Sequence, residues 1–68
     1  MNMMLLDSYS FGNRKAVVFQ LQETQFRVEL YEDNKLVTYI VSPSLSEATK
    51  VAQSFTDGNN SQLLRENV

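Results

Sequence analysis

Histidine and cysteine are both missing from the 68-residue chain, and this limits the chemistry that its side chains could perform. Without cysteine there is no disulfide and no thiolate ligand for a metal. Without histidine, the commonest nitrogen ligand and the usual general base are missing as well. The remaining candidates are eight Asp and Glu residues for acid–base work and a set of serines as nucleophiles. We therefore expect no metal and no other cofactor.

The carboxylates do not follow a catalytic pattern. General acid–base catalysis needs two carboxyl groups that converge in one pocket with perturbed pKa values. Glu32 and Asp33 are adjacent, but they lie at a predicted turn, where solvent should surround them. Glu47 is explained by its place in a helix cap. The serines have no histidine to activate them. We expect the protein not to be an enzyme.

Length and charge point to one small domain that covers residues 1–68. The net charge is −2, and no block of like charge is present that would form a basic or acidic tail. The apolar stretch 1–6 is short and follows no basic residue, so it predicts neither a secretory signal nor a membrane span. We therefore expect a cytoplasmic protein with no membrane partner.

The middle of the chain predicts a β-hairpin. Residues 25–32 alternate between apolar and polar side chains, which is the pattern of a half-buried strand. Asp33-Asn34 follows, and both residues tolerate the positive φ of a two-residue mirror-image turn. Residues 35–41 are rich in Val, Thr, Tyr and Ile and predict the returning strand. This turn would place Leu30 opposite Val37.

Residues 15–22 extend the alternation upstream as a further strand. A two-residue turn at Glu23-Thr24 would pair Leu21 with Phe26, although Glu-Thr is a poor turn dipeptide and a longer or bulged loop is the alternative. The three strands then share one apolar face. Its predicted members are Val17, Phe19, Leu21, Phe26, Val28, Leu30, Val37, Tyr39 and Val41.

A fourth strand is expected over residues 5–11, before the turn signal Gly12-Asn13. Its register stays open at this point. A two-residue turn would place Leu6 toward the apolar face, whereas a three-residue loop would place Tyr9 and Phe11 there.

A helix follows the strands. Ser44 and Glu47 form a capping box, with Ser44 as the N-cap. Apolar residues then recur at helical spacing, and Asp57-Gly58 predicts the end of the helix. Residues 59–68 are then either a flexible tail or a short extra strand. The elements together predict an α+β fold: a three- to four-stranded antiparallel β-meander with one C-terminal amphipathic helix packed on one face.

The other sheet face has no cover within the chain, because only one helix is available. An apolar surface of this kind often marks an interface. We expect the protein to bind a protein partner or itself, most simply as a homodimer, through this face or by strand addition at a sheet edge. A structural homo-oligomer is one alternative. The expected interface residues are Val18, Arg27, Tyr31, Leu36 and Ile40.

A second alternative is a sheet that binds single-stranded nucleic acid. Tyr31 and Arg27 suit a surface that stacks bases and contacts phosphates. Glu29 lies beside them, and the chain is acidic overall, so the general attraction for phosphate is missing. We therefore do not expect nucleic acid to be the main partner.

The stretch from Phe26 to Val37, followed by Ser44-Leu45-Ser46-Glu47-Ala48, resembles small uncharacterised proteins of phages and bacteria, including cyanophages. Those proteins carry a strand, an acidic turn, a second strand and a helix that begins with serine. The resemblance covers about half of the chain. It implies a viral accessory protein that binds a host or viral component, and it carries no catalytic or binding residues over to this sequence.

Overall fold

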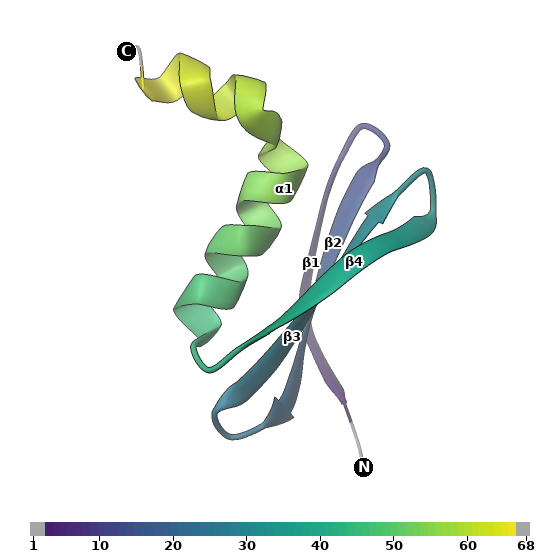
Figure 1. The fold of residues 1–68 in the computed structure, drawn as a ribbon, viewed down its shortest axis with the longest axis vertical. Helices are drawn as coiled ribbons and strands as arrows, with labels where there is room; N and C mark the ends of the chain where they lie inside the picture. The colour runs from purple at the N-terminus through teal and green to yellow at the C-terminus, as the bar shows by residue number, and fades with distance from the viewer. Residues whose placement is uncertain (1–2, 67–68) are drawn as a thin grey trace.

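The computed structural model describes residues 3–66, with side chains described over residues 3–56. Four strands form one antiparallel sheet in the order β1-β2-β3-β4, and a single helix packs against one face of it (Figure 1). This confirms the predicted α+β meander with one C-terminal helix. The elements are β1 (Met4–Phe11), β2 (Arg14–Gln22), β3 (Gln25–Glu32), β4 (Lys35–Ser42) and α1 (Leu45–Glu66).

All three predicted turns are present. Gly12-Asn13, Glu23-Thr24 and Asp33-Asn34 each join neighbouring strands as two-residue turns. Asp33 and Asn34 have φ values of 56° and 67°, which is the mirror-image geometry expected of this pair. The tips of the first and third hairpins are also joined, since the backbone N–H of Asp33 donates to the carbonyl of Asn13 at 2.8 Å.

Two bulges change the predicted register. Leu21 is an extra residue in β2, so Phe26 pairs with Gln20 and not with Leu21. Val37 is an extra residue in β4, so Leu30 pairs with Thr38 and not with Val37. The side-chain period of a strand is two, so a shift of one residue exchanges the two faces.

The predicted apolar face is consequently right for β3 and wrong for β2 and β4. Of the nine residues expected on it, only those of β3 are buried in the core. The core proper is Ala16, Val18, Phe26, Val28, Leu30, Ala48 and Ala52, with Tyr9, Ile40, Val51 and Phe55 partly buried around it.

Small side chains decide how closely α1 approaches the sheet. Ala48 and Ala52 are completely buried, and they face a sheet surface that includes the equally buried Ala16 and Val18. The helix lies mainly over β2, β3 and β1 and has little contact with β4. Residues with short side chains on both sides allow this close packing, which leaves the larger Phe19 on the opposite face of β2.

The start of α1 is as predicted, and its end is not. The backbone N–H of Glu47 donates to the Oγ of Ser44 at 3.3 Å, which confirms Ser44 as the N-cap. The helix then continues through Asp57-Gly58 to Glu66, so residues 59–66 form neither a tail nor an added strand. Glycine inside a helix costs only about 1 kcal/mol relative to alanine. Residues 67–68 of the expected tail lie outside the described residues.

The first strand has the turn length of one predicted alternative and the inward-facing residue of the other. The turn has two residues, because Phe11 pairs with Arg14, yet Tyr9 and not Leu6 packs against the core. The face exchange in β2 explains this, since Tyr9 pairs with the buried Ala16. A bulge at Leu6 interrupts the same strand, and Phe11 is exposed at its end.

Candidate functional site: the outer face of the sheet

The sheet face opposite α1, here called the outer face, is built from three rows of side chains that cross the four strands. Antiparallel partners on neighbouring strands point to the same side, so the register defines each row. The rows are Leu5, Phe19, Arg27 and Val41; Ser8, Val17, Glu29 and Tyr39; and Ser10, Lys15, Tyr31 and Leu36.

Apolar and aromatic side chains make up most of this face. Leu5, Leu36, Tyr39 and Val41 are exposed large hydrophobic residues, each with close to half or more of its surface in contact with solvent. Phe19 lies between them and is half-buried. Several exposed apolar side chains on one face of a small protein are characteristic of a binding site.

A charged cluster occupies the centre of the outer face. The Nε of Arg27 lies 3.0 Å from Oε2 of Glu29, and the hydroxyl of Tyr31 donates to Oε1 of the same carboxylate at 2.7 Å. The guanidinium of Arg27 also stacks on the ring of Tyr39, at 3.8 Å from its centroid. Both oxygens of Glu29 are therefore bonded within the chain, although no element of residues 3–66 packs over this face.

Burial and contacts restrain these groups. The Glu29 side chain is only 13% exposed and that of Arg27 is 26% exposed, which is low for charged residues on an uncovered sheet. The hydrogen bond to Glu29 is the main reason that the pKa of Tyr31 is raised above 10.0, and burial adds to it. Lys15 lies over the other side of the cluster, 5.6 Å from the centroid of the Tyr31 ring.

The structure places the five expected interface residues on different faces. Arg27, Tyr31 and Leu36 lie on the outer face, as predicted. The expectation that Val18 and Ile40 would lie beside them is wrong. Val18 is 1% exposed in the core, and Ile40 packs against that core. The bulges at Leu21 and Val37 are the physical reason, because they invert the part of each strand beyond the bulge, residues 14–20 of β2 and 38–42 of β4.

Their places on the outer face are taken by neighbours that sequence reasoning assigned to the core: Val17, Phe19, Tyr39 and Val41. In β2 both alternating sets are apolar, so alternation could not choose between them. One signal could have done so. Ala16 is the small residue that best matches the closely packed Ala48 and Ala52 of the helix.

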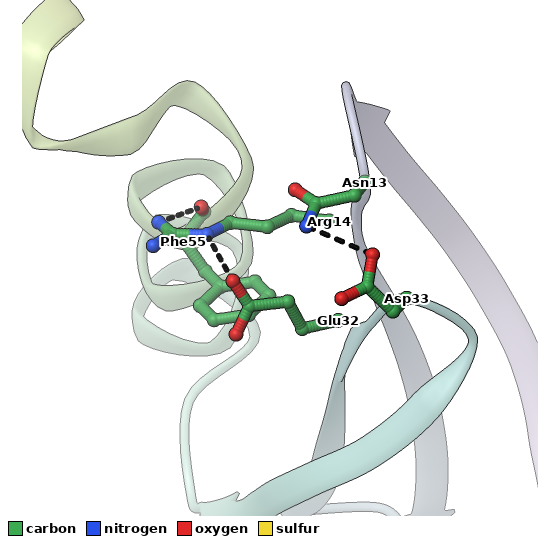
Figure 2. A network of polar contacts seen from close by, with 5 residues as sticks. All are labelled: Asn13, Arg14, Glu32, Asp33 and Phe55. Carbon is green, nitrogen blue, oxygen red and sulfur yellow. Dashed lines mark hydrogen bonds and ion pairs between the residues drawn. The ribbon is translucent and has the colours of Figure 1, made fainter.

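A second polar group lies on the helix side of the sheet, where Arg14 reaches from β2 to α1 (Figure 2). Its Nη1 donates to the carbonyl of Phe55 at 3.3 Å, its guanidinium lies 5.0 Å from the Phe55 ring centroid, and its Nε is 3.7 Å from Glu32. Nearby, the side chain of Asn13 donates to Asp33 at 3.0 Å. The contacts of Arg14 with Phe55 fasten the sheet end to the helix, and the Asn13–Asp33 hydrogen bond joins two turns of the sheet.

Glu32 and Asp33, the adjacent carboxylates, are thus used in contacts with Arg14 and Asn13. Within residues 3–66, no helix has the length and apolar character to cross a bilayer. Among the side chains described, those of residues 3–56, no three acidic groups gather as they would around a metal ion. Comparison of the chain with protein-family models, with curated proteins and with solved structures finds no match.

Proposed function

We propose that this protein is a non-enzymatic interaction module whose outer face binds a second copy of the chain, giving a homodimer. The observation that carries the proposal is an apolar, aromatic sheet face with a charged centre that is already satisfied internally. Tyr and Arg are enriched in protein interfaces, and both stand at the centre of this face.

The charge arrangement favours a second copy over an unlike partner. In a two-fold interface a residue near the symmetry axis faces its own copy, so an unpaired charge at the centre of the face would meet a like charge or be left desolvated. Glu29 and Arg27 avoid this because each is paired with the other before any partner arrives. An unlike partner would gain most from charges left unpaired for it to bind.

The size of the face predicts a weak dimer. Strands of eight or nine residues give a face roughly 25 Å long, and four strands make it roughly 20 Å wide, so each copy could bury about 500 Å². The total is near the lower limit for a specific interface, which suggests micromolar affinity. Association would also support a domain whose small core is marginal by itself.

Two substitutions in β4 test the proposal. Val41→Asp places a charge on the outer face, whereas Thr38→Asp places the same charge at an exposed position of the same strand, on the row that pairs with the buried Leu30. We expect sedimentation and light scattering to show a dimer for the unmutated chain and for Thr38→Asp, and a monomer for Val41→Asp. A monomeric unmutated chain at high micromolar concentration would contradict the proposal.

Single-stranded nucleic acid is the second candidate for the same face. The register brings three rings and two cations onto it, namely Phe19, Tyr31, Tyr39, Lys15 and Arg27, and rings on an open sheet can stack bases. Fluorescence anisotropy with labelled oligonucleotides at low salt tests this. Binding that weakens with salt and with Tyr39→Leu would support it, and no binding at low salt would remove it.

The resemblance to phage proteins supports a role as a viral accessory protein in the host cytoplasm. The dimer would then either be a structural unit or present its remaining surfaces to a host or viral protein. Affinity capture from infected cells, with the unmutated chain and Val41→Asp side by side, separates these roles. A host or viral protein captured only by the dimeric form supports the accessory role, and an absence of any specific capture supports a structural unit.

A further inference from the structure

A groove of about 480 Å³ lies between α1 and the sheet, near the start of β2 and the end of β3. It is on the helix side of the sheet, so it is separate from the outer face. Its volume is in the range of small-molecule sites, which is about 300–1,000 Å³. The groove is lined by Arg14, Leu30, Lys50, Val51, Ser54 and Phe55.

The lining combines an apolar floor with a cationic rim. Leu30 is almost fully buried, and Val51 and Phe55 pack against the same core, so the floor is held in place. Arg14 and Lys50 bring two positive charges to the groove in a chain whose net charge is −2. Such a lining matches a ligand with an apolar body and one negative charge.

Arg14 is oriented for this role. Its guanidinium lies over the ring of Phe55 and donates to the carbonyl of that residue (Figure 2). These contacts hold Arg14 in place as one of the residues that line the groove. The ion pair with Glu32 is long, at 3.7 Å, and both side chains are about 40% exposed. Exposed pairs of this kind contribute at most about 1 kcal/mol, so a ligand carboxylate can replace Glu32.

We propose that this groove binds a small amphipathic carboxylic acid. The apolar body lies on Leu30, Val51 and Phe55, and the carboxylate accepts hydrogen bonds from Arg14. Lys50 adds a second positive charge, and Glu32 is the one described carboxylate that competes for Arg14. This binding is independent of the outer face and does not rest on the proposed dimer.

Three probes with the same eight-carbon chain test the role of charge: octanoate, octan-1-ol and octylammonium. Amide chemical shifts of the full-length protein report both affinity and location. We expect octanoate to bind in the millimolar range, to shift Val51, Ser54 and Phe55, and to bind more tightly than the alcohol. The ammonium should bind most weakly. Equal affinity for octanoate and octan-1-ol, or shifts centred on the outer face, would overturn the proposal.

Charge variants give predictions of opposite sign. Lys50→Met keeps the aliphatic stem and should weaken octanoate binding by about threefold without changing octan-1-ol binding. Glu32→Gln removes the competing carboxylate and should strengthen octanoate binding by about twofold. Lys15→Met makes the same charge change on the outer face and should have no effect. Weaker octanoate binding by Glu32→Gln, or unchanged octanoate binding by Lys50→Met, would refute the site.

Discussion

The hydroxyl of Tyr31 donates a 2.7 Å hydrogen bond to the carboxylate of Glu29, two residues earlier on the same strand. Residues i and i+2 of a strand point to the same face, so this contact is local and does not depend on a partner molecule. It joins the phenol to the Arg27–Glu29 ion pair and so fixes the centre of the outer face.

Glu29→Gln should lower the pKa of Tyr31. The hydrogen bond from the phenol to an ionised acceptor is the first cause of the raised pKa, and the charge of Glu29 adds to it. An amide oxygen can still accept the bond but carries no charge. Ultraviolet absorbance of tyrosinate during an alkaline titration measures the shift. Tyr31→Phe identifies the transition, and an unchanged titration in Glu29→Gln would contradict the assigned contact.

The folded state should lose stability above about pH 10. Burial first and the contact with Asp7 second raise the pKa of Tyr9, and the contact with Glu29 raises that of Tyr31. Both phenols therefore hold their protons more tightly in the folded chain than in the unfolded chain. This contribution is complete below the unfolded pKa of 10.0 and is lost as pH rises through the higher folded values.

Urea unfolding at several pH values measures that loss. Tyr9→Phe combined with Tyr31→Phe should flatten the alkaline decline in unfolding free energy, because the two differential titrations are then removed. A decline of equal steepness in the double variant would show that other groups cause it.

Truncation of two adjacent residues of β2 should have different effects, one mainly on stability and the other mainly on self-association. Val18 is buried, so Val18→Ala should cost about 2 kcal/mol of unfolding free energy through lost burial and an unfilled space. Phe19 lies on the outer face, and we expect Phe19→Ala to cost under about 1 kcal/mol while weakening self-association. Urea unfolding and sedimentation of both variants provide the measurements. The reverse order of stabilities would mean that the observed register is wrong.

The turn at Asn34 offers a conformational prediction. Asn34 has a φ of 67°, which glycine adopts readily and which a β-branched residue adopts only with strain. Asn34→Val should therefore cost about 1–3 kcal/mol, whereas Asn34→Gly should be neutral or slightly stabilising. Thermal unfolding followed by circular dichroism compares them. Equal melting temperatures for the two variants would argue against the mirror-image turn.

Local signals were sufficient to predict the four strands, their order and the start of α1, but not the end of α1. The Asp33-Asn34 turn and the Ser44 cap each arise from the chemistry of a few adjacent residues, and both lie where the sequence places them. It was harder to predict which side chains of β2 and β4 face the core, because each of these strands has apolar residues in both alternating positions. The poor Glu23-Thr24 turn allowed for a bulge near Leu21 without locating it, and Val37 looks like an ordinary strand residue until the strands are paired.

The predicted outer-face positions of Val18 and Ile40 are wrong for the same reason. Arg27 and Tyr31 belong to β3, where polar and apolar residues alternate cleanly, and they were placed on the correct face. Val18 and Ile40 belong to the two ambiguous strands and were exchanged with their neighbours. The groove beside Arg14 had no local signal, because its lining comes from β2, β3 and α1 and is assembled only by the fold.

The meander order has a consequence for how the chain acquires its interior. Each strand pairs only with its neighbours in sequence, so the hairpins can form in succession with short loops to close. The helix comes last, and before it docks both sheet faces are open to water. We therefore expect the docking of α1 to complete the core, because its two buried alanines pack on the side of the sheet that carries Ala16 and Val18.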